Sequence, residues 1–406
     1  MPPTWSRRPS SDRAPGAMRG PGSMREANER LVLDHLLARP EARSAPQLAA
    51  DTGLSRPTAN QALARLEAAG LVRQSGRRTG QAGRAARLFE PDPDAGRVLA
   101  AHVGEGRVRL LLADLSGRVV ERQSVEVPDG TDLAAETAQR LTGLLAAHEV
   151  PCERVLSVVV GSPGTYDPGS HRLWHTANLP GWDGPALLPL LPAELGPLVR
   201  FENDIDLAAV AEHTDGAGRG VDDFVLLSVG DGVGLGAFCG GRLHRGSHGS
   251  AGEIAFLLVG AEDPRGPARE RGALESAASS DALLAAARAA GLGELAEPAE
   301  LFALAAAGDA AALAVQDREV DLLARALVAV AAIHDPELVV LGGPALGEHA
   351  ESLLGPLADR FSALVPLPLP ALTASATGAD ATLSGALAHA RRHAWREAHA
   401  RACAAG

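Results

Sequence analysis

Lysine is absent from this chain of 406 residues, so its 38 basic side chains other than histidine are all arginines. Aromatic residues are scarce, at 3%, and the core must therefore be built from leucine, valine and alanine. No apolar run approaches the roughly 20 residues that span a bilayer, and the N-terminus lacks the apolar segment of a secretory signal. These absences predict a globular, cytoplasmic protein with no membrane partner.

Cysteine is equally rare. Cys152, Cys239 and Cys403 are scattered along the chain without metal-like spacing. An odd number of isolated thiols in a cytosolic protein argues against a disulfide framework. We interpret all three as ordinary packed or surface thiols.

Charge is distributed unevenly. Residues 1–90 hold 15 arginines and 8 acids, a net charge of +7, whereas residues 91–406 hold 23 arginines and 42 acids, a net charge of −19. A basic amino-terminal segment on an acidic body is the asymmetry expected of a nucleic-acid-binding head. The length allows two or three domains, each with its own core.

The basic segment has two parts. Residues 1–22, rich in Pro, Gly, Ser and Arg, are predicted to form a disordered basic tail. Residues 23–90 have the pattern of a winged helix-turn-helix domain. Its expected elements are a helix from Met24 to near Pro40, a helix over Ala45–Thr52, a helix capped by Ser55 and running to about Ala69, and strands over Leu71–Gln74 and Arg84–Phe89.

In such a domain the third helix enters the major groove and presents its first residues to base edges. Arginine reads guanine and Asn or Gln reads adenine, while arginines of the wing rest on phosphate or enter the minor groove. The residues expected to contact DNA are Arg56, Pro57, Thr58, Asn60, Gln61 and Arg65, with Arg77, Arg78 and Arg84 in the wing. The alternative is a protein-docking helical domain with a solvated polar face.

Beyond a polar linker over residues 91–97, the chain divides into two similar halves. Each half opens with a predicted β-meander and continues as β/α units. The meanders cover Val98–Val125 and Phe224–Leu243, and the last helix begins at about Ala381. This pattern predicts an α/β fold, a duplicated ribonuclease-H-like domain of two lobes over residues 98–395, with a ligand cleft between the lobes and a tail over residues 396–406.

Polar residues gather around a glycine-rich loop, Gly230–Gly236. Asn203 and Asp204 end a predicted strand, which is where ligand groups are expected in an open α/β sheet. Glu253 and Glu275 follow the loop. Carboxylates accept paired hydrogen bonds from neighbouring hydroxyls, so the set suits a polyhydroxylated ligand. The alternative is that these residues only hold a hinge together.

Together these motifs resemble the ROK family (repressors, open reading frames and kinases), in its winged-helix repressor branch, over roughly residues 24–390. The resemblance implies a sugar-kinase-like (actin-like) domain and hexose-contacting roles for Asn203, Asp204, Glu253 and Glu275. Asp204 matches the family's catalytic base, and Phe256 stands where the family has a histidine. Asn178, in the preceding loop, is added to the expected ligand-binding set.

Two family motifs are altered. Family sugar kinases hold ATP phosphates and magnesium with an Asp-x-Gly-Gly-Thr turn, and here that segment reads His102-Val103-Gly104-Glu105-Gly106. Phosphoryl transfer depends on positioning and charge neutralisation, so we expect neither ATP as a cofactor nor kinase activity, and no catalytic residue.

The zinc motif is also missing. Ala255-Phe256 replace the family's Gly-His, and Gly266, Ala268 and Ala273 stand where its three cysteines would be. No thiolate or imidazole remains there to bind the ion, so we expect no metal.

The expected function is a sequence-specific DNA-binding regulator of carbohydrate-metabolism genes, a repressor by its resemblance to that branch of the family, controlled by a sugar or sugar derivative. The family implies a homodimer or dimer of dimers on a double-stranded DNA operator. Two alternatives stay open. One is a sugar kinase with a DNA-binding head, and the other is a DNA-binding protein that responds to no ligand.

Overall fold

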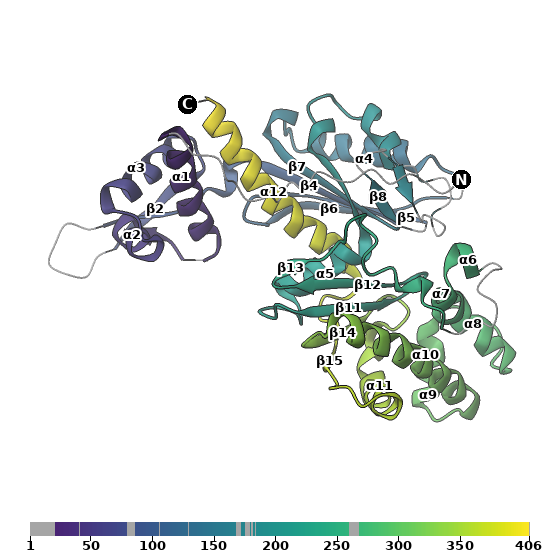
Figure 1. Ribbon diagram of the computed structural model, residues 1–406. Helices are drawn as coiled ribbons and strands as arrows, with labels where there is room; N and C mark the ends of the chain where they lie inside the picture. The colour runs from purple at the N-terminus through teal and green to yellow at the C-terminus, as the bar shows by residue number, and fades with distance from the viewer. Residues whose placement is uncertain are drawn as a thin grey trace.

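The computed structural model describes residues 21–39, 41–78, 86–104, 106–128, 130–167, 172–174, 179, 182, 184–259 and 268–405. Within these residues the chain forms an amino-terminal head and two lobes (Figure 1). The lobes are stacked in the view of Figure 1, and the head lies beside them.

The head is a winged helix-turn-helix domain, as predicted. Its elements are α1 (Pro21–Leu37), β1 (Arg43–Ser44), α2 (Ala45–Thr52), α3 (Arg56–Ala68), β2 (Val72–Arg78) and β3 (Ala86–Pro91), with the sheet order β1-β3-β2. Gly53 ends α2 in the left-handed region, at φ 73°. Ser55 caps α3 by accepting a 3.2 Å hydrogen bond from the main-chain N–H of Thr58. The first helix begins at Pro21, three residues before the expected start.

The amino-terminal lobe is built on a sheet of order β10-β7-β4-β5-β6. Its elements are β4 (Arg97–Gly104), β5 (Arg107–Asp114), β6 (Val119–Glu126), α4 (Leu133–Ala147), β7 (Val155–Ser162) and β10 (Val199–Asn203). The first three strands form the antiparallel meander, and β7 and β10 add to it in parallel. Leu141 and Leu144 of α4 pack on the sheet in one hydrophobic cluster with Leu99 and Leu110.

The carboxy-terminal lobe repeats this plan with a sheet of order β13-β12-β11-β14-β15. Its strands are β11 (Phe224–Val229), β12 (Val233–Cys239), β13 (Arg242–Leu243), β14 (Leu338–Gly342) and β15 (Ala371–Ala374). Its helices are α6 (Ala268–Arg271), α7 (Ala273–Ala278), α8 (Ser280–Ala289), α9 (Pro298–Ala306), α10 (Ala310–His334) and α11 (Ala350–Leu364). In chain order both sheets run third, second, first, fourth, fifth, which confirms the predicted duplication.

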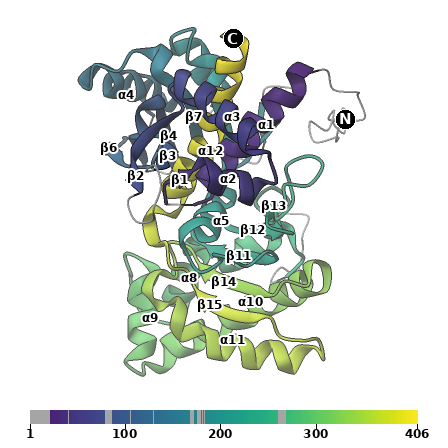
Figure 2. The ribbon, with the colours of Figure 1, turned by 90° about the vertical axis from the view of Figure 1, so that its left-hand side faces the viewer.

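Two helices, α5 (Asp204–Asp215) and α12 (Ala381–Ala405), pack together between the lobes (Figures 1 and 2). Their backbones approach closely at Gly385, where a Cβ would lie 1.7 Å from the main-chain oxygen of Leu207. From there α12 continues toward the head. It is the yellow helix that ends beside α1 and α3 in Figure 1.

The predicted boundaries differ from the structure at two places. The expected tail over residues 396–406 is part of α12, which continues to Ala405 because Trp395 and Ala398 belong to a hydrophobic cluster that also holds Leu33 and Leu66 of the head. The expected linker over residues 91–97 is structured as well. The N–H of Asp92 donates to the oxygen of Leu71 (3.0 Å), and β4 begins at Arg97.

Among the described residues, no single helix is long and apolar enough to cross a membrane. The pair α9 and α10 would reach that length and composition together, but the two helices meet at 115°.

Candidate functional site

The first part of the candidate ligand site is the junction where β10 ends and α5 begins. The side chain of Asn203 caps the helix, with Oδ1 accepting from the N–H groups of Ile205 (2.9 Å) and Asp206 (3.0 Å). Its amide Nδ2 donates to the oxygen of Gly164 (3.2 Å). Asn203 is therefore used mainly to hold the junction in place, and Asp204 occupies the first position of the helix.

Asp204 lies close to carboxylates of the other lobe. Burial, and then the charges of Glu253 and Glu275, raise the pKa of Asp204 to about 6 despite a hydrogen bond from the N–H of Ile205. Glu253 accepts a 3.3 Å hydrogen bond from the hydroxyl of Thr165, which belongs to the amino-terminal lobe. The structure thus brings Asn203, Asp204, Glu253 and Glu275 together from both lobes, and their binding of a ligand stays a prediction.

Glu275 stabilises the glycine-rich loop. One of its oxygens accepts from the N–H of Val233 (3.1 Å), and the other from Nε of Arg271 (3.2 Å). Arg271 in turn donates to the main-chain oxygen of Asp231 (3.0 Å). Both oxygens of Glu275 have partners within the protein, so the contacts of this residue favour the hinge alternative over direct ligand binding.

Two acids that the sequence reasoning passed over belong to the same cluster. Glu202 is held by Nε and Nη2 of Arg245 (3.0 and 2.9 Å) and by His389 of α12 (3.1 Å). These partners overcome burial and lower the pKa of Glu202 to about 2. Burial, and then the charges of Glu202, Glu253 and Asp204, raise the pKa of Asp206 to about 8.

Asp206 is therefore predominantly protonated at pH 7 and is able to donate a hydrogen bond. The only signal for it in the sequence was its position two residues after Asp204, which gave no reason to expect it to be buried. The residue as a whole is only 6% exposed.

The segment that matches the first phosphate turn of family kinases has a different chemistry here. Burial, and then the charge of Arg109, lower the pKa of His102 to about 3, so the imidazole is neutral at pH 7. Its Nδ1 lies 2.8 Å from Nη2 of Arg109, a cross-strand neighbour on β5. Arg109 also donates to the oxygen of Ala379 (2.7 Å) and pairs with Asp380 (3.5 Å).

The remaining positions that the sequence singled out fall into two groups. Asn178, Glu105 and Gly266 lie outside the described residues. Phe256 is half-buried in a short 3-10 helix, Ile254–Phe256, directly after Glu253. Ala268 and Ala273, at the positions of the family's cysteines, begin α6 and α7.

The predicted DNA-binding surface begins at the amino end of α3. Arg56, Pro57, Asn60 and Gln61 are exposed, and Thr58 is half-buried. Asn60 donates to the main-chain oxygen of Arg56 (3.0 Å) in the free protein. Four of the five predicted residues at the start of α3 are thus accessible to a partner, and their contact with DNA stays a prediction.

The other predicted arginines differ from one another in position and in partners. Arg65 pairs with Glu29 of α1 (3.1 Å) on the side of α3 that faces the body. Arg77 and Arg78 lie on β2, and Arg84 is outside the described residues. Two arginines that were not predicted, Arg73 and Arg87, pair with Glu90 (2.9 Å) and Glu67 (2.7 Å) in the wing.

Comparison with protein families accounts for both parts of the chain. Residues 98–393 match the model of the ROK family, and residues 26–85 match that of the MarR family. This chain belongs to the ROK family. The head is of the MarR winged-helix type, which confirms the predicted combination of a ROK domain with a winged helix.

ROK relatives of known name include both kinases and repressors. A glucokinase of Thermotoga maritima is 34% identical over 216 residues, 50% of this chain and 68% of that protein. A xylose repressor of Caldicellulosiruptor bescii is 25% identical over 64% of this chain and 65% of that protein. Sequence identity thus relates this chain both to a kinase and to a repressor.

Among solved structures, a ROK family transcriptional regulator described as a homologue of the E. coli MLC protein matches 94% of this chain and 100% of its own, with a TM-score of 0.76 and 22% identity. A ROK hexokinase from Thermus thermophilus matches 71% of this chain and 96% of its own, with a TM-score of 0.57 and 29% identity. The first likeness shows that the fold includes the head.

Proposed function

We propose that this ROK protein is a transcriptional regulator whose winged helix binds operator DNA and whose two-lobed domain senses a sugar or sugar derivative without phosphorylating it. Two copies would place their heads on a palindromic operator, since protein symmetry is mirrored in the DNA site. The proposal places the protein in the cytoplasm, where the operator is found.

The observation that carries the proposal is the path of α12. This helix contacts the candidate ligand site at one end, through Glu202 and His389, and the head at the other, through the cluster that contains Trp395 and Leu33. A ligand that favours one arrangement of the lobes therefore has a continuous element through which to move the head. The ligand must bind one arrangement more tightly than the other for this to occur.

The proposal that catalysis is lost rests on His102. At this turn a kinase needs a ligand for magnesium and hydrogen-bond donors that hold the phosphates of ATP. Here a neutral imidazole stands at the position of the aspartate, and the nearby guanidinium of Arg109 is already engaged by His102 and by the segment around Asp380. These contacts leave the turn poorly suited to Mg-ATP.

A kinase is the second candidate, because one observation favours it. Asp204 keeps the position of the family's base, and its pKa of about 6 suits proton transfer near neutral pH. The glucokinase relatives agree with that role.

The test is thermal unfolding against a panel of monosaccharides, sugar phosphates and disaccharides, with and without Mg-ATP. A ligand at 100 times its Kd stabilises the native state by about 2.7 kcal/mol. We expect a sugar-specific shift that is indifferent to Mg-ATP, and the same sugar should change binding to a DNA fragment selected from a random pool. Hydrolysis of ATP that depends on that sugar would support the kinase instead. If no compound in a broad panel shifts the unfolding temperature, a regulator that responds to no ligand would be favoured.

The matched variants are Asp204→Asn and Asp215→Asn, at the two ends of α5. Losing a charged hydrogen-bond partner of the sugar costs about 1.5–3 kcal/mol, or roughly ten- to 100-fold in affinity. We expect Asp204→Asn to lose the sugar response while it keeps DNA binding. Asp215 is exposed, and its variant should behave as the wild type. An unchanged sugar response in Asp204→Asn would contradict the site.

A further inference from the structure

A cavity of about 570 Å³ lies where the head meets the body. Its walls come from α1 and α3 of the head, from Glu153 and Arg154 before β7, and from the end of α12. The candidate sugar-site residues do not line it. The cavity therefore belongs to the joint between the two parts of the chain.

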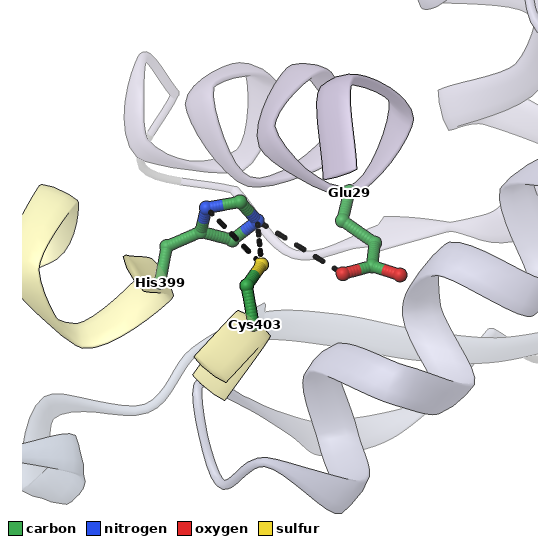
Figure 3. A group of neighbouring side chains, drawn as sticks. All are labelled: Glu29, His399 and Cys403. Atoms are coloured by element: carbon green, nitrogen blue, oxygen red, sulfur yellow. Dashed lines mark hydrogen bonds and ion pairs between the residues drawn. The ribbon is translucent and has the colours of Figure 1, made fainter. Parts of the chain in front are cut away.

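Three potential metal ligands meet at the edge of this cavity: Glu29 of α1, and His399 and Cys403 of α12 (Figure 3). Nε2 of His399 lies 4.0 Å from Oε2 of Glu29 and 3.7 Å from Sγ of Cys403. One oxygen, one nitrogen and one sulfur all lie within 4.8 Å of one another. His399 and Cys403 are four residues apart, so they share one face of the helix.

These spacings are close to those of a tetrahedral metal site. With bonds of about 2.0–2.3 Å to N, O and S, tetrahedral geometry separates the ligand atoms by roughly 3.3–3.6 Å. Binding requires the side chains to rotate inward, because the 4.0 Å between Nε2 of His399 and Oε2 of Glu29 must shorten by about 0.7 Å and no pair is more than about 1.2 Å too far apart. Three protein ligands with a fourth position open to the cavity also match the usual number for an ion that keeps a water.

The three candidate ligands are shielded from solvent at this joint, with Cys403 half-buried. The thiol of Cys403 would lose its proton on binding the ion, since the thiolate is the ligand. Glu29 and His399 are each only 8% exposed.

Neighbouring charges are balanced around the cluster. Arg25 and Arg30 of α1 face it together with Glu26 and Asp34, and Arg65 of α3 binds the second oxygen of Glu29 (3.1 Å). That contact leaves Oε2 of Glu29 toward His399 and fixes the orientation of the carboxylate, as the outer partners of metal ligands do.

We propose that Glu29, His399 and Cys403 bind a divalent transition metal of the zinc class, and that the ion clamps the head onto α12. Such a site is distinct from the family's cysteine motif, which this chain lacks, and it departs from the expectation of no metal stated above. It does not depend on whether the ROK domain senses a sugar or phosphorylates one.

Co²⁺ is the probe for the site, because a cobalt–thiolate bond gives a charge-transfer absorption in the near ultraviolet. The full-length chain carrying Cys152→Ser and Cys239→Ser keeps Cys403 as its one thiol, and it should bind one Co²⁺ with that absorption. Adding Cys403→Ser to this background should abolish the band. Absence of the band from the first protein, or its persistence in the second, would overturn the proposal.

Two further variants separate ligation from folding. Glu29→Gln keeps an acceptor for Arg65, and His399→Asn keeps a polar side chain of moderate size. Each should weaken Co²⁺ binding by more than about tenfold while the metal-free protein unfolds in a single transition near that of the wild type. Unchanged affinity in both would overturn the assigned ligand set.

The clamp has its own readout in hydrogen exchange. Zn²⁺ should slow exchange in residues 24–37 of α1 in the wild type but not in Cys403→Ser. Metal binding without added protection of α1 would show that the ion does not hold the head, and the clamp would be rejected.

Discussion

The hydroxyl of Thr382, in the first turn of α12, donates a hydrogen bond of 3.2 Å to the main-chain oxygen of Asp204. Three residues later Gly385 lies against the backbone of Leu207, and four residues after that His389 reaches Glu202. The start of α5 is thus tied to α12 along two turns. A ligand that displaces Asp204 would therefore also displace α12, the helix that leads to the head.

Gly385→Ala should disturb this contact. Its new Cβ would lie 1.7 Å from the oxygen of Leu207, so the two helices must separate. We expect a loss of about 1–3 kcal/mol in the free energy of unfolding, as for other overpacked sites, measured by urea denaturation.

Gly143→Ala is the control for that variant. Gly143 lies in α4, where an added Cβ meets nothing within 4 Å. Alanine there should stabilise the protein by about 0.5–1 kcal/mol, through helix propensity alone. Equal effects of the two substitutions would show that α5 and α12 are not in tight contact.

Glu202→Gln should weaken the attachment of β10 to α12. Breaking a buried pair costs about 3 kcal/mol, and we expect a loss of roughly that size at pH 7 because Arg245 and His389 both lose their charged partner. The pKa of Glu202 in the folded state is about 2, below its ordinary value of 4.5. Its stabilisation is therefore complete above pH 4.5 and is lost as the pH falls through 2, so the difference between wild type and variant should shrink with acidification.

The control is the exposed pair of Glu397 and Arg401, also on α12. Glu397→Gln should change the free energy of unfolding by about 0.5 kcal/mol or less, because exposed helix pairs contribute little. If Glu202→Gln were equally mild at pH 7, the pair would not be holding the junction.

Glu319 gives a second pH dependence, of opposite sign. It is fully buried in α10, neither carboxylate oxygen has a hydrogen-bond partner among the described residues, and burial raises its pKa to about 8. Because the pKa is raised in the folded state, the stability that the protonated form of Glu319 contributes is fully present below pH 4.5, and it is lost as the pH rises through 8. Glu319→Gln should flatten this slope.

Glu319→Leu should in addition raise the free energy of unfolding at pH 8 by about 1–3 kcal/mol, since it removes a buried polar group. Calorimetry at pH 5 and pH 8 is the measurement. The exposed Asp317, on the same helix, provides the control variant Asp317→Asn, whose stability should follow that of the wild type at both pH values.

Arg56→Ala should reduce affinity for the selected DNA fragment by about 1–3 kcal/mol and relax its sequence preference, as expected for a base-reading arginine. Arg56 is exposed and has no ion pair within the part of the chain that the structure describes. Arg73→Ala removes the same charge from the same domain, but Arg73 is paired with Glu90, so a smaller and uniform loss is expected. Fluorescence anisotropy at two salt concentrations would distinguish the two. Equal losses would show that α3 does not read bases.

Helices and strands could be predicted from the sequence where local signals and tertiary contacts agree. Ser55, Pro57 and Gly70 placed α3 because a cap, a first-turn proline and a left-handed glycine each act within a few residues. The antiparallel meander of each lobe could be predicted because short turns leave neighbouring strands little choice of partner. The position of Asn203 and Asp204 at the end of a strand could also be predicted, because a mainly apolar run, Leu198–Phe201, shortly precedes them.

Contacts between residues far apart in the chain could not be read in this way. Asp206 and Glu202 gain their properties from burial and from Arg245 and His389, which no local pattern indicates. The end of α12 was mistaken for a tail because its alanines and polar residues form a weakly amphipathic helix, which is ordered by packing on the head. Cys403 looked isolated for the same reason, since Glu29 joins it from nearly the opposite end of the sequence.

The position of Trp395 has a consequence for how the protein is made. The head is synthesised before the two lobes, yet the hydrophobic cluster that holds Val32 and Leu33 also holds Trp395 and Ala398, about 360 residues later in the chain. Domains generally fold as they are synthesised, but this one cannot complete its packing until α12 has been translated. Docking of the winged helix onto the body should therefore follow the folding of both lobes, and only chains that include α12 would present the head in its final orientation.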